Sequence, residues 1–480
     1  MVGTAQQHQR IEAQHARGRL TARERLDILF DEATIVEIGR TGEGVVTAMG
    51  AISGRPAFAF AQDVTDADGT ITSLHAGKIT ALIDRAIAAG APIIGLYDSP
   101  GALLNEGLAT LAAQTTIMQR QSLASGVVPQ LALLFGHHAG ATALSPALAD
   151  VTFMLAPSTL FLAGPDIVRG ATGELASAET LGGATLHASR TGIADAAFTN
   201  EIEMLVAARD LLDLLPSAAG DAAPSRSTPD SPDRETPALD TLVPLDPDTP
   251  YDMRELLRAI ADERELFELQ SNHAGNLICA LGRIHGRSIG IVASHPLVLA
   301  GTIDGAAARK AARFVRFCDS FSLPIVTIID SPGFLPGAAE EAGGIVRHAA
   351  ILLAAYAQAT VPRITLVTRR ALGGAWAVLA PKPLGTTACY AWPGAEIAAI
   401  GGAAAAERLF GLNEHQKRRD YAARIADPRR AVASGLVDAV IRPAATRATI
   451  ARALRQSAGG RHYHPSPSRS GTMRERDRNG

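Results

Sequence analysis

The sequence has few cysteines, and no group of residues has the spacing of a metal site. The three cysteines, Cys279, Cys318 and Cys389, lie far apart and form no CxxC pair. This excludes a disulfide framework and a cysteine zinc ribbon. His137 and His138 are adjacent but have no carboxylate cluster beside them, so we expect a structural role for both. We therefore predict no metal in this chain.

Long apolar runs and an excess of charge of one sign are also absent. No apolar run reaches the ~20 residues that a membrane span needs, and the polar N-terminus has no signal-peptide core. Lys and Arg number 45 against 48 Asp and Glu, which gives no reason to expect a nucleic-acid partner. Hydrophobic residues make up 47 %, so a large core is available. We expect a cytoplasmic protein of several domains, bound to neither membrane nor nucleic acid.

A proline-rich segment and the similarity between the parts on either side of it divide the chain into two domains. Eight of the 27 prolines fall within residues 216–250, which predicts an inter-domain linker there. The flanking domains are predicted at 1–215 and 251–455, and a polar, disordered tail at 456–480. Because several motifs recur in the two blocks at one offset of 232 residues, we infer an internal duplication. The matched pairs are Gly50 and Gly282, Gly54 and Gly286, Lys78 and Lys310, Pro92 and Pro324, and Asp98-Ser-Pro-Gly101 and Asp330-Ser-Pro-Gly333.

Both blocks show the pattern of an α/β fold. Short apolar runs such as 92–97 and 325–329 are typical of buried strands. Helical patterns lie between them, for example at 74–89 and 306–321. Alternating strands and helices predict layers around a largely parallel sheet.

The most informative motifs are glycine-rich junctions that should join strands to helices, two in each block. They are Asp98–Ala102, Ala139–Thr142, Asp330–Phe334 and Leu372–Ala375. A helix that begins with Gly or Ala leaves its first N–H groups free and unshielded, and such donors suit an oxyanion. Small residues could instead serve only to pack a helix closely on a sheet. Four junctions at equivalent places favour oxyanion holes. Neither a P-loop nor a hydrolytic serine elbow fits the chain.

Residues from about 14 to 455 resemble the carboxyltransferase (beta) subunit of biotin-dependent acyl-CoA carboxylases, of the propionyl-CoA carboxylase type. The matching stretches span both blocks and include Ala16–Asp27, Gly164–Val168, Asp330–Gly337, Gly343–His348 and Ala391–Pro393. The resemblance implies two domains of the ClpP/crotonase superfamily, in agreement with the duplication. It also implies transfer of a carboxyl group from carboxybiotin to the α-carbon of an acyl-CoA.

The resemblance implies a role for particular residues. The N–H groups of Gly140 and Ala141 would face the thioester carbonyl, and those of Gly374 and Ala375 the ureido carbonyl of biotin. Further substrate-binding positions by the family pattern are Gly101, Ala102, Gly333, Phe334, Trp376 and Ala377. Family members commonly have a larger side chain than Ala377, so we expect acyl groups larger than propionyl to be accepted.

The resemblance also implies partners. No Ala-Met-Lys-Met biotin-carrier motif occurs in the chain, so a biotin carboxylase/biotin-carrier (alpha) subunit would supply carboxybiotin. The family assembles as a homo-hexamer, a trimer of dimers, with coenzyme A thioesters as substrates.

The chain departs from the family pattern mainly in its first block. Pro100 replaces a glycine, Ala141 replaces the second glycine of Ala-Gly-Gly-Ala, and His137-His138 replaces Pro-Cys. Two alternatives therefore remain beside the carboxylase interpretation. One is a biotin-dependent decarboxylase subunit for a malonyl- or methylmalonyl-type thioester, and the other is a non-catalytic scaffold subunit.

Overall fold

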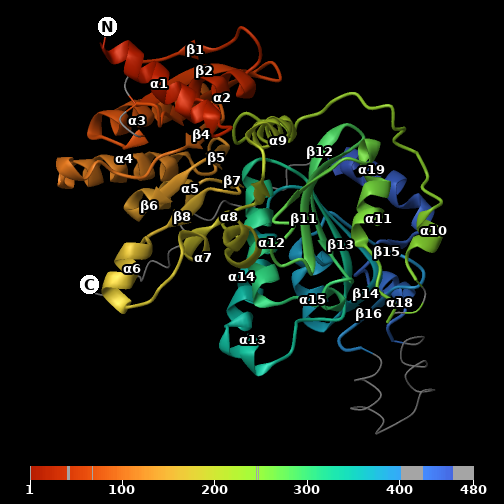
Figure 1. Cartoon of the computed structure of the whole chain (residues 1–480). Helices are drawn as coiled ribbons and strands as arrows, with labels where there is room; N and C mark the ends of the chain where they lie inside the picture. Colours follow the sequence, from red (N-terminus) through yellow and green to blue (C-terminus); the bar gives the residue numbers. More distant parts are fainter. Residues whose placement is uncertain are drawn as a thin grey trace, which may run out of the picture.

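The computed structural model describes residues 2–39, 44–66, 69–244, 246, 248–401 and 425–457. It shows two large β-sheets, each with its own helices, in the first and second parts of the chain (Figure 1), beside a small two-stranded sheet. The predicted tail 456–480 lies outside the described residues, apart from the two that end the last helix. Within the described ranges, no helix is both long and apolar enough to cross a membrane.

The first sheet has the strand order β1-β2-β3-β4-β5-β7-β9. The pairs β1–β2 and β2–β3 are antiparallel, and the rest of the sheet is parallel. Its strands are β1 (Val36–Glu37), β2 (Val45–Ile52), β3 (Arg55–Gln62), β4 (Ile93–Tyr97), β5 (Gln130–Leu134), β7 (Val151–Leu155) and β9 (Ala196–Phe198), and β6 (His137–Ala139) pairs separately with β8 (Thr159–Phe161). The helices are α1 (Val2–Ala16), α2 (Ala22–Leu29), α3 (Ser73–Ala89), α4 (Leu108–Ala124), α5 (Leu144–Ala147), α6 (Pro165–Thr172), α7 (Ala178–Gly182), α8 (Ala184–Leu186) and α9 (Glu201–Leu214).

The second sheet repeats this arrangement in the order β10-β11-β12-β13-β14-β15-β17, with β16 also paired to β14. Its strands are β10 (Leu266–Leu269), β11 (Leu277–Ile284), β12 (Arg287–Ser294), β13 (Ile325–Ser331), β14 (Arg363–Leu372), β15 (Ala388–Ala391), β16 (Glu396–Ala398) and β17 (Ala439–Val440). The helices are α10 (Leu239–Leu242), α11 (Met253–Ile260), α12 (Gly305–Ser320), α13 (Ala338–Ala342), α14 (Ile345–Gln358), α15 (Gly373–Val378), α18 (Pro428–Ala433) and α19 (Thr446–Ser457). The predicted mixed α/β fold is confirmed, and each sheet begins with an antiparallel edge.

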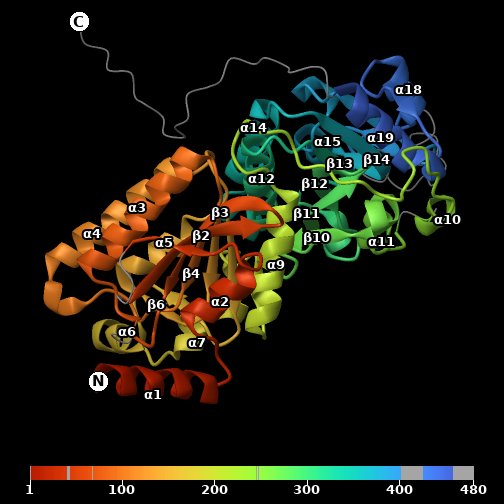
Figure 2. The same cartoon turned by 90° about the horizontal axis from the view of Figure 1, so that it is seen from above.

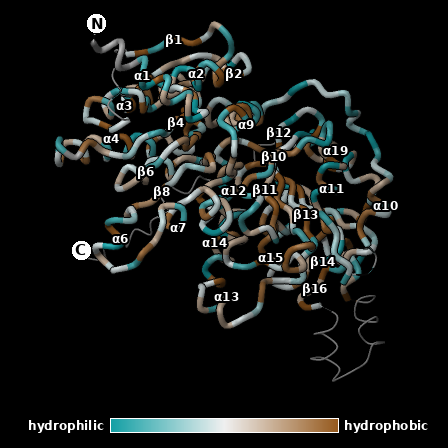
Figure 3. Tube along the Cα trace, in the orientation of Figure 1, coloured by the Kyte–Doolittle hydropathy of each residue, from teal (hydrophilic) through white to brown (hydrophobic). Residues whose placement is uncertain are grey.

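The layers arise because successive side chains of a buried strand point to opposite faces of the sheet, and helices cover both faces. Ile94 and Leu96 of β4 pack with α2 and α9 on one face, and Ile93 and Tyr97 pack with α3 and α4 on the other. The core that contains α2 and α9 continues into α12 and α14 of the second half. Hydrophobic strands therefore run through the interior of both halves, as the brown segments of Figure 3 show.

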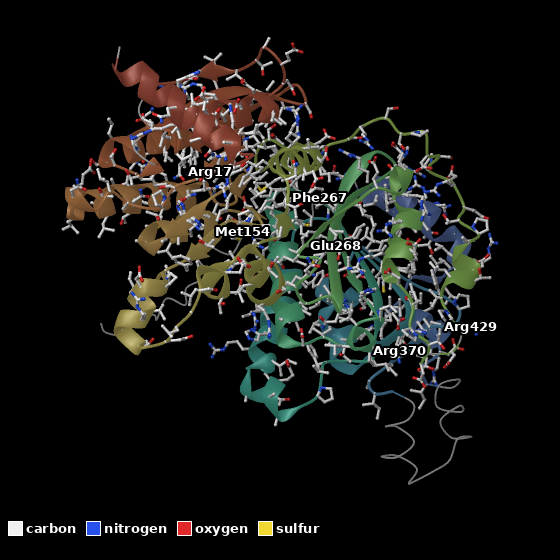
Figure 4. The ribbon with its side chains drawn as sticks, viewed as in Figure 1. Arg17, Met154, Phe267, Glu268, Arg370 and Arg429 are labelled. Carbon is white, nitrogen blue, oxygen red and sulfur yellow. The ribbon has the colours of Figure 1, made fainter. Side chains whose placement is uncertain are left out.

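Ring stacking and charge join the halves as well. Phe153 of β7 stacks on Phe267 of β10 with ring centroids 6.1 Å apart, and Phe267 lies between the two halves in Figure 4. Arg313 of α12 donates to the buried carboxylate of Asp195 at 2.9 Å. In the view from above, α9 and α12 lie at this junction (Figure 2).

The proline-rich segment 216–250 begins against the first half, where the Ala219 N–H donates to the carbonyl of Val127 at 2.8 Å, and then contacts the second half. Ser225 forms a β-bridge with Arg287, and the Thr236 N–H donates to the carbonyl of Ala444 at 2.8 Å. Farther on, the carbonyl of Thr249 accepts from Arg369. The segment is therefore more closely packed than its composition alone indicates, because its polar backbone has hydrogen-bond partners on both halves.

Candidate active site

The two Asp-Ser-Pro-Gly motifs form equivalent turns. The first motif directly follows β4, and the second begins within the last residues of β13. The glycine that ends each motif has a positive φ, 121° at Gly101 and 137° at Gly333. The Gly101 carbonyl accepts from Ile71 at 2.9 Å, and the Gly333 carbonyl accepts from Ile303 at 3.0 Å. The two donors, like the two acceptors, are separated by the repeat offset, so the duplicated spacing produces duplicated contacts.

The prediction that these two motifs open helices is wrong. Ala102 forms a β-bridge with Ile71, and Phe334 forms the matching bridge with Ile303. The following α-helices begin later, at Leu108 and Ala338. The backbone N–H of each glycine instead faces the hydroxyl of the serine two residues earlier, at 3.1 Å in the first turn and 3.4 Å in the second.

The first predicted oxyanion hole lies where β6 ends. A short 3₁₀ helix begins at Gly140, which has φ of 71°, and continues through Ala143. Ala141 is exposed and is not in the left-handed region, so its methyl group causes no backbone strain there. No side chain caps this helix, and no acceptor elsewhere in the described chain pairs with the Ala141 N–H. That N–H is free to bind an oxyanion.

The second predicted hole lies where β14 ends. Helix α15 begins at Gly373, whose φ of 53° lies in the same region as that of Gly140, and no side chain caps it. By this conformation Gly140 corresponds to Gly373 and Ala141 to Gly374, so the predicted donor pairs are staggered by one residue. Gly374 is exposed, whereas Ala375 is buried. The described part of the chain offers no backbone partner to the Gly374 N–H.

Each turn lies directly beside its hole. A Cβ placed on Gly101 would be 3.2 Å from the carbonyl oxygen of Ala139, and one on Gly333 would be 3.9 Å from that of Leu372. A Cβ on Gly374 would be 2.7 Å from the ring of Phe334. The predicted site residues therefore form two groups, one on each sheet: Gly101, Ala102, Gly140 and Ala141, and Gly333, Phe334, Gly374, Ala375, Trp376 and Ala377.

His138 is buried beside the first hole and is uncharged. Burial lowers its pKa from 6.5 to about 4, against weaker opposing contacts with the backbone of Ser99 and Thr142. Its ring packs edge-on against Tyr97, whose hydroxyl bonds to Ser145 at 3.0 Å. A neutral, enclosed imidazole supports the shape of the hole and cannot serve as a cation there. Among the described residues, no group of three or more His, Cys, Asp or Glu could hold a metal.

The burial of His138 predicts a pH dependence of stability. The unfolded chain binds a proton near pH 6.5 and the folded chain only near pH 4, so stability falls as the pH drops between these values. We expect His138→Phe to remove this loss, which amounts to about 3 kcal/mol by the size of the pKa shift. Chemical denaturation of both proteins from pH 7 to pH 4 measures it. Equal slopes for the two proteins would show that His138 is not buried in this state.

The sequence reasoning missed the buried arginines at both turns. Arg25 contacts Asp98 at 2.7 Å, and Arg369 contacts Asp330 at 2.9 Å. The available signal was the repeated aspartate itself, because a carboxylate at the end of a buried strand needs a partner. Sequence alone did not show which arginine would be that partner.

The comparison with family models identifies the class of protein. The Carboxyl transferase domain model matches residues 13–470. The chain belongs to this family. Among curated carboxyl transferases it is 46 % identical to the propionyl-CoA carboxylase beta chain of Roseobacter denitrificans, over 93 % of this chain and 92 % of that protein. It is 44 % identical to the human mitochondrial propionyl-CoA carboxylase beta chain, over 92 % and 86 % respectively.

A solved carboxyl transferase structure agrees with this assignment. Transcarboxylase 12S, described as a hexamer with methylmalonyl-coenzyme A bound, superimposes with a TM-score of 0.93 at 37 % identity. The match covers 96 % of this chain and 94 % of that one. The predicted function, a carboxyltransferase of the propionyl-CoA carboxylase type, is therefore confirmed, and this protein is an enzyme.

Proposed function

We propose that this carboxyltransferase moves the carboxyl group of carboxybiotin, carried by a partner subunit, to the α-carbon of an acyl-CoA. The observation that carries the proposal is the pair of equivalent helix starts with free N–H groups, one on each sheet. The reaction develops negative charge at two places, the thioester oxygen and the ureido oxygen. Two preorganised sets of donors match these two charges.

The first hole would bind the thioester oxygen. The Gly140 and Ala141 N–H groups lie at the start of a short 3₁₀ helix, where donors have no partner within the helix. Both donors bind the enolate oxygen more strongly than the neutral carbonyl, which lowers the barrier to forming the enolate. The neighbouring His138 is neutral and buried, so we assign it no proton transfer. The α-proton would instead pass to the ureido nitrogen of biotin, whose bond to the carboxyl carbon breaks as the new carbon–carbon bond forms.

The second hole would bind biotin. The missing side chain at Gly374 leaves room for the Phe334 ring against the helix start, and a flat ring beside free donors fits a planar ureido group. When bound, carboxybiotin supplies the activated carboxyl group. The chain's own contribution is to orient the ureido oxygen toward the N–H groups of Gly374 and Ala375.

The same proposal covers domains and assembly. The repeated sheet order and the repeated turns support two crotonase-like domains from a duplication, at about 1–215 and 251–455, with 216–250 between them. The hexamer described for transcarboxylase 12S supports a homo-hexamer of this chain. The family supports a biotin carboxylase/biotin-carrier partner, because the chain has no biotin-attachment motif of its own.

The position of Ala377 predicts a graded preference for acyl-chain length. Ala377 is half-buried on α15, three residues after Gly374, and its side chain is a single methyl group. By the family pattern the active site lies between the N-domain of one protomer and the C-domain of another, so this residue on the biotin side would also line the acyl pocket. We expect Ala377→Ile to shift relative kcat/KM toward acetyl- and propionyl-CoA, by a factor that reflects ~0.8 kcal/mol per methylene. Competition between acyl-CoA pairs measures this shift. A profile identical to wild type would place Ala377 outside the pocket.

One relative favours a second reaction. The chain is 41 % identical to the methylmalonyl-CoA decarboxylase subunit alpha of Veillonella parvula, over 97 % of this chain. The same two holes would serve the reverse transfer, from a methylmalonyl-type thioester to biotin, because the transition state is shared. The partner subunits would then set the direction.

Identifying the partner separates these reactions. We expect affinity purification of the intact complex from its source, followed by mass spectrometry, to recover a biotinylated protein with an ATP-dependent biotin carboxylase. Recovery of a biotinylated protein without an ATP-dependent biotin carboxylase would instead support the reverse transfer. A complex without any biotinylated protein would contradict both.

A further inference from the structure

Both Asp-Ser-Pro-Gly turns begin with an aspartate that is almost completely buried. Asp98 directly follows β4 with 3 % of its surface exposed, and Asp330, on β13, has 0 % exposed. A carboxylate at such depth needs a charged partner with good geometry. The two aspartates hold equivalent positions, but their partners come from unrelated parts of the chain.

In the first half the partner is Arg25 of α2. Its Nη1 donates to Asp98 Oδ2 at 2.7 Å, while Nε and Nη2 donate to the two carboxylate oxygens of Glu201 at 2.8 and 3.0 Å. Arg25 is 1 % exposed, and its guanidinium lies 4.0 Å from the ring centroid of Phe135. Thus α2, α9 and the turn are held together by one side chain.

In the second half the partner is Arg369 of β14. Its Nε donates to Asp330 Oδ2 at 2.9 Å, and Nη1 donates to the carbonyls of Asp246 and Thr249 at 2.9 and 2.8 Å. The guanidinium lies 5.2 Å from the ring centroid of Tyr251. The neighbouring Arg370, labelled in Figure 4, is 3.5 Å from Asp330 Oδ1.

The difference between the halves has a geometric cause. Gly136 lies four residues before Gly140, and Arg369 lies four residues before the equivalent Gly373. Gly136 and Arg369 therefore occupy equivalent positions in the two halves. A Cβ on Gly136 would overlap Oδ1 of Asp98. In the first half the aspartate therefore fills the space that a side chain would take, and the arginine has to arrive from α2.

Each arginine–aspartate pair touches both segments that shape its hole. Asp98 begins the turn that places Gly101 against the Ala139 carbonyl, and it also packs on Gly136, just before β6. Ala139 directly precedes Gly140, so a shift of the aspartate moves the first donor. Arg369 lies on the same strand that leads into Gly373 and Gly374.

We infer that Arg25 and Arg369 are positioning residues, each of which holds one oxyanion hole in shape through the buried aspartate of the adjacent turn. The inference rests on the proposed function, since it assigns the first hole to the thioester and the second to biotin. Arg25 should therefore affect binding of the thioester, and Arg369 should affect binding of biotin.

The test uses an enolate mimic and no biotin. The probe is the nitronate of 2-nitropropionyl-CoA, whose charged oxygens resemble an enolate, and propionyl-CoA is the neutral reference. Calorimetric titration of the full-length chain gives the ratio of the two dissociation constants. In Arg25→Lys we expect this preference for the nitronate to fall by about tenfold to a hundredfold, because small displacements of donors cost that much. Propionyl-CoA affinity should stay near that of wild type.

Variants of Arg369 and Arg447 serve as comparisons. Arg369→Lys should keep the nitronate preference of wild type while lowering kcat for carboxylation. Arg447→Lys disturbs a buried ion pair with Asp262 (2.7 Å) that contacts neither turn, and both quantities should stay unchanged. If Arg25→Lys does not fold, Asp98→Asn replaces it. That variant alters the same Arg25–Asp98 contact by removing the charge of the aspartate.

The outcomes separate the inference from the proposed function. A wild-type chain with no preference for the nitronate would overturn the assignment of the first hole, and with it this inference. A wild-type preference that persists in Arg25→Lys and Asp98→Asn would overturn the positioning role alone. Equal loss of preference in Arg25→Lys, Arg369→Lys and Arg447→Lys would show a general effect of stability and would also overturn it.

Discussion

Ala141→Pro is expected to lower acyl-CoA carboxylation by about 10²–10³-fold, the usual result of losing one oxyanion-hole donor. The substitution deletes the Ala141 N–H and little else, because the side chain is exposed and proline is tolerated in the first turn of a helix. Steady-state kcat with the carboxylated partner and excess acyl-CoA measures the loss.

Ala141→Ser is the matched control, since it changes the exposed side chain and keeps the N–H. Its activity should stay near that of wild type, and the thermal transitions of all three proteins should agree. Near-normal turnover in Ala141→Pro would show that the first half holds no oxyanion site. The scaffold interpretation would then gain support.

A single methyl group at Gly374 is expected to disable the second hole. The added Cβ would lie 2.7 Å from the Phe334 ring, so the ring or the helix start has to move. A displaced ring disturbs the surface proposed to face biotin, and a displaced helix start takes the Gly374 N–H away from the ureido oxygen. In either case we expect activity to fall by about a hundredfold. The equivalent position of the first hole already has an alanine, Ala141, and its side chain is exposed. We therefore expect a methyl group to be tolerated in the first hole and to be harmful in the second.

The double variant Gly374→Ala/Phe334→Ala tests the cause. Removing the ring relieves the overlap, so the double variant should be more active than Gly374→Ala alone, although without the ring beside biotin it should not reach wild type. The same assay at saturating acyl-CoA, with the biotinylated carrier varied, places the defect on the biotin side. No recovery in the double variant would show that the overlap is not the reason for the loss.

The periodicity of the sequence was enough to predict the central strands and helices. Apolar runs bounded by turn residues marked β4 and β13, and the helical patterns at 74–89 and 306–321 match α3 and α12 closely. The internal repeat reappears as matching contacts of Ile71 and Ile303. These features are local or repeated, so a single sequence contains them.

The turns and the packing around them were less predictable. Glycine after proline signals a turn, but it does not distinguish a helix start from a loop that bridges back to Ile71. The one-residue stagger between the two holes depends on which residue has the positive φ, and the fold gives it to Gly140 in the first half and to Gly373 in the second. Arg25 is 73 residues from Asp98, and only the fold brings them together.

Transfer of a labelled carboxyl group tests the proposed reaction most directly. The biotinylated partner is charged with ¹⁴C-bicarbonate and ATP, freed of both, and mixed with this chain and an acyl-CoA, with or without avidin. We predict that label moves from the carrier to the acyl-CoA only when this chain is present, and that avidin stops the transfer. Label that reaches the acyl-CoA with the carrier sequestered by avidin would contradict the proposal.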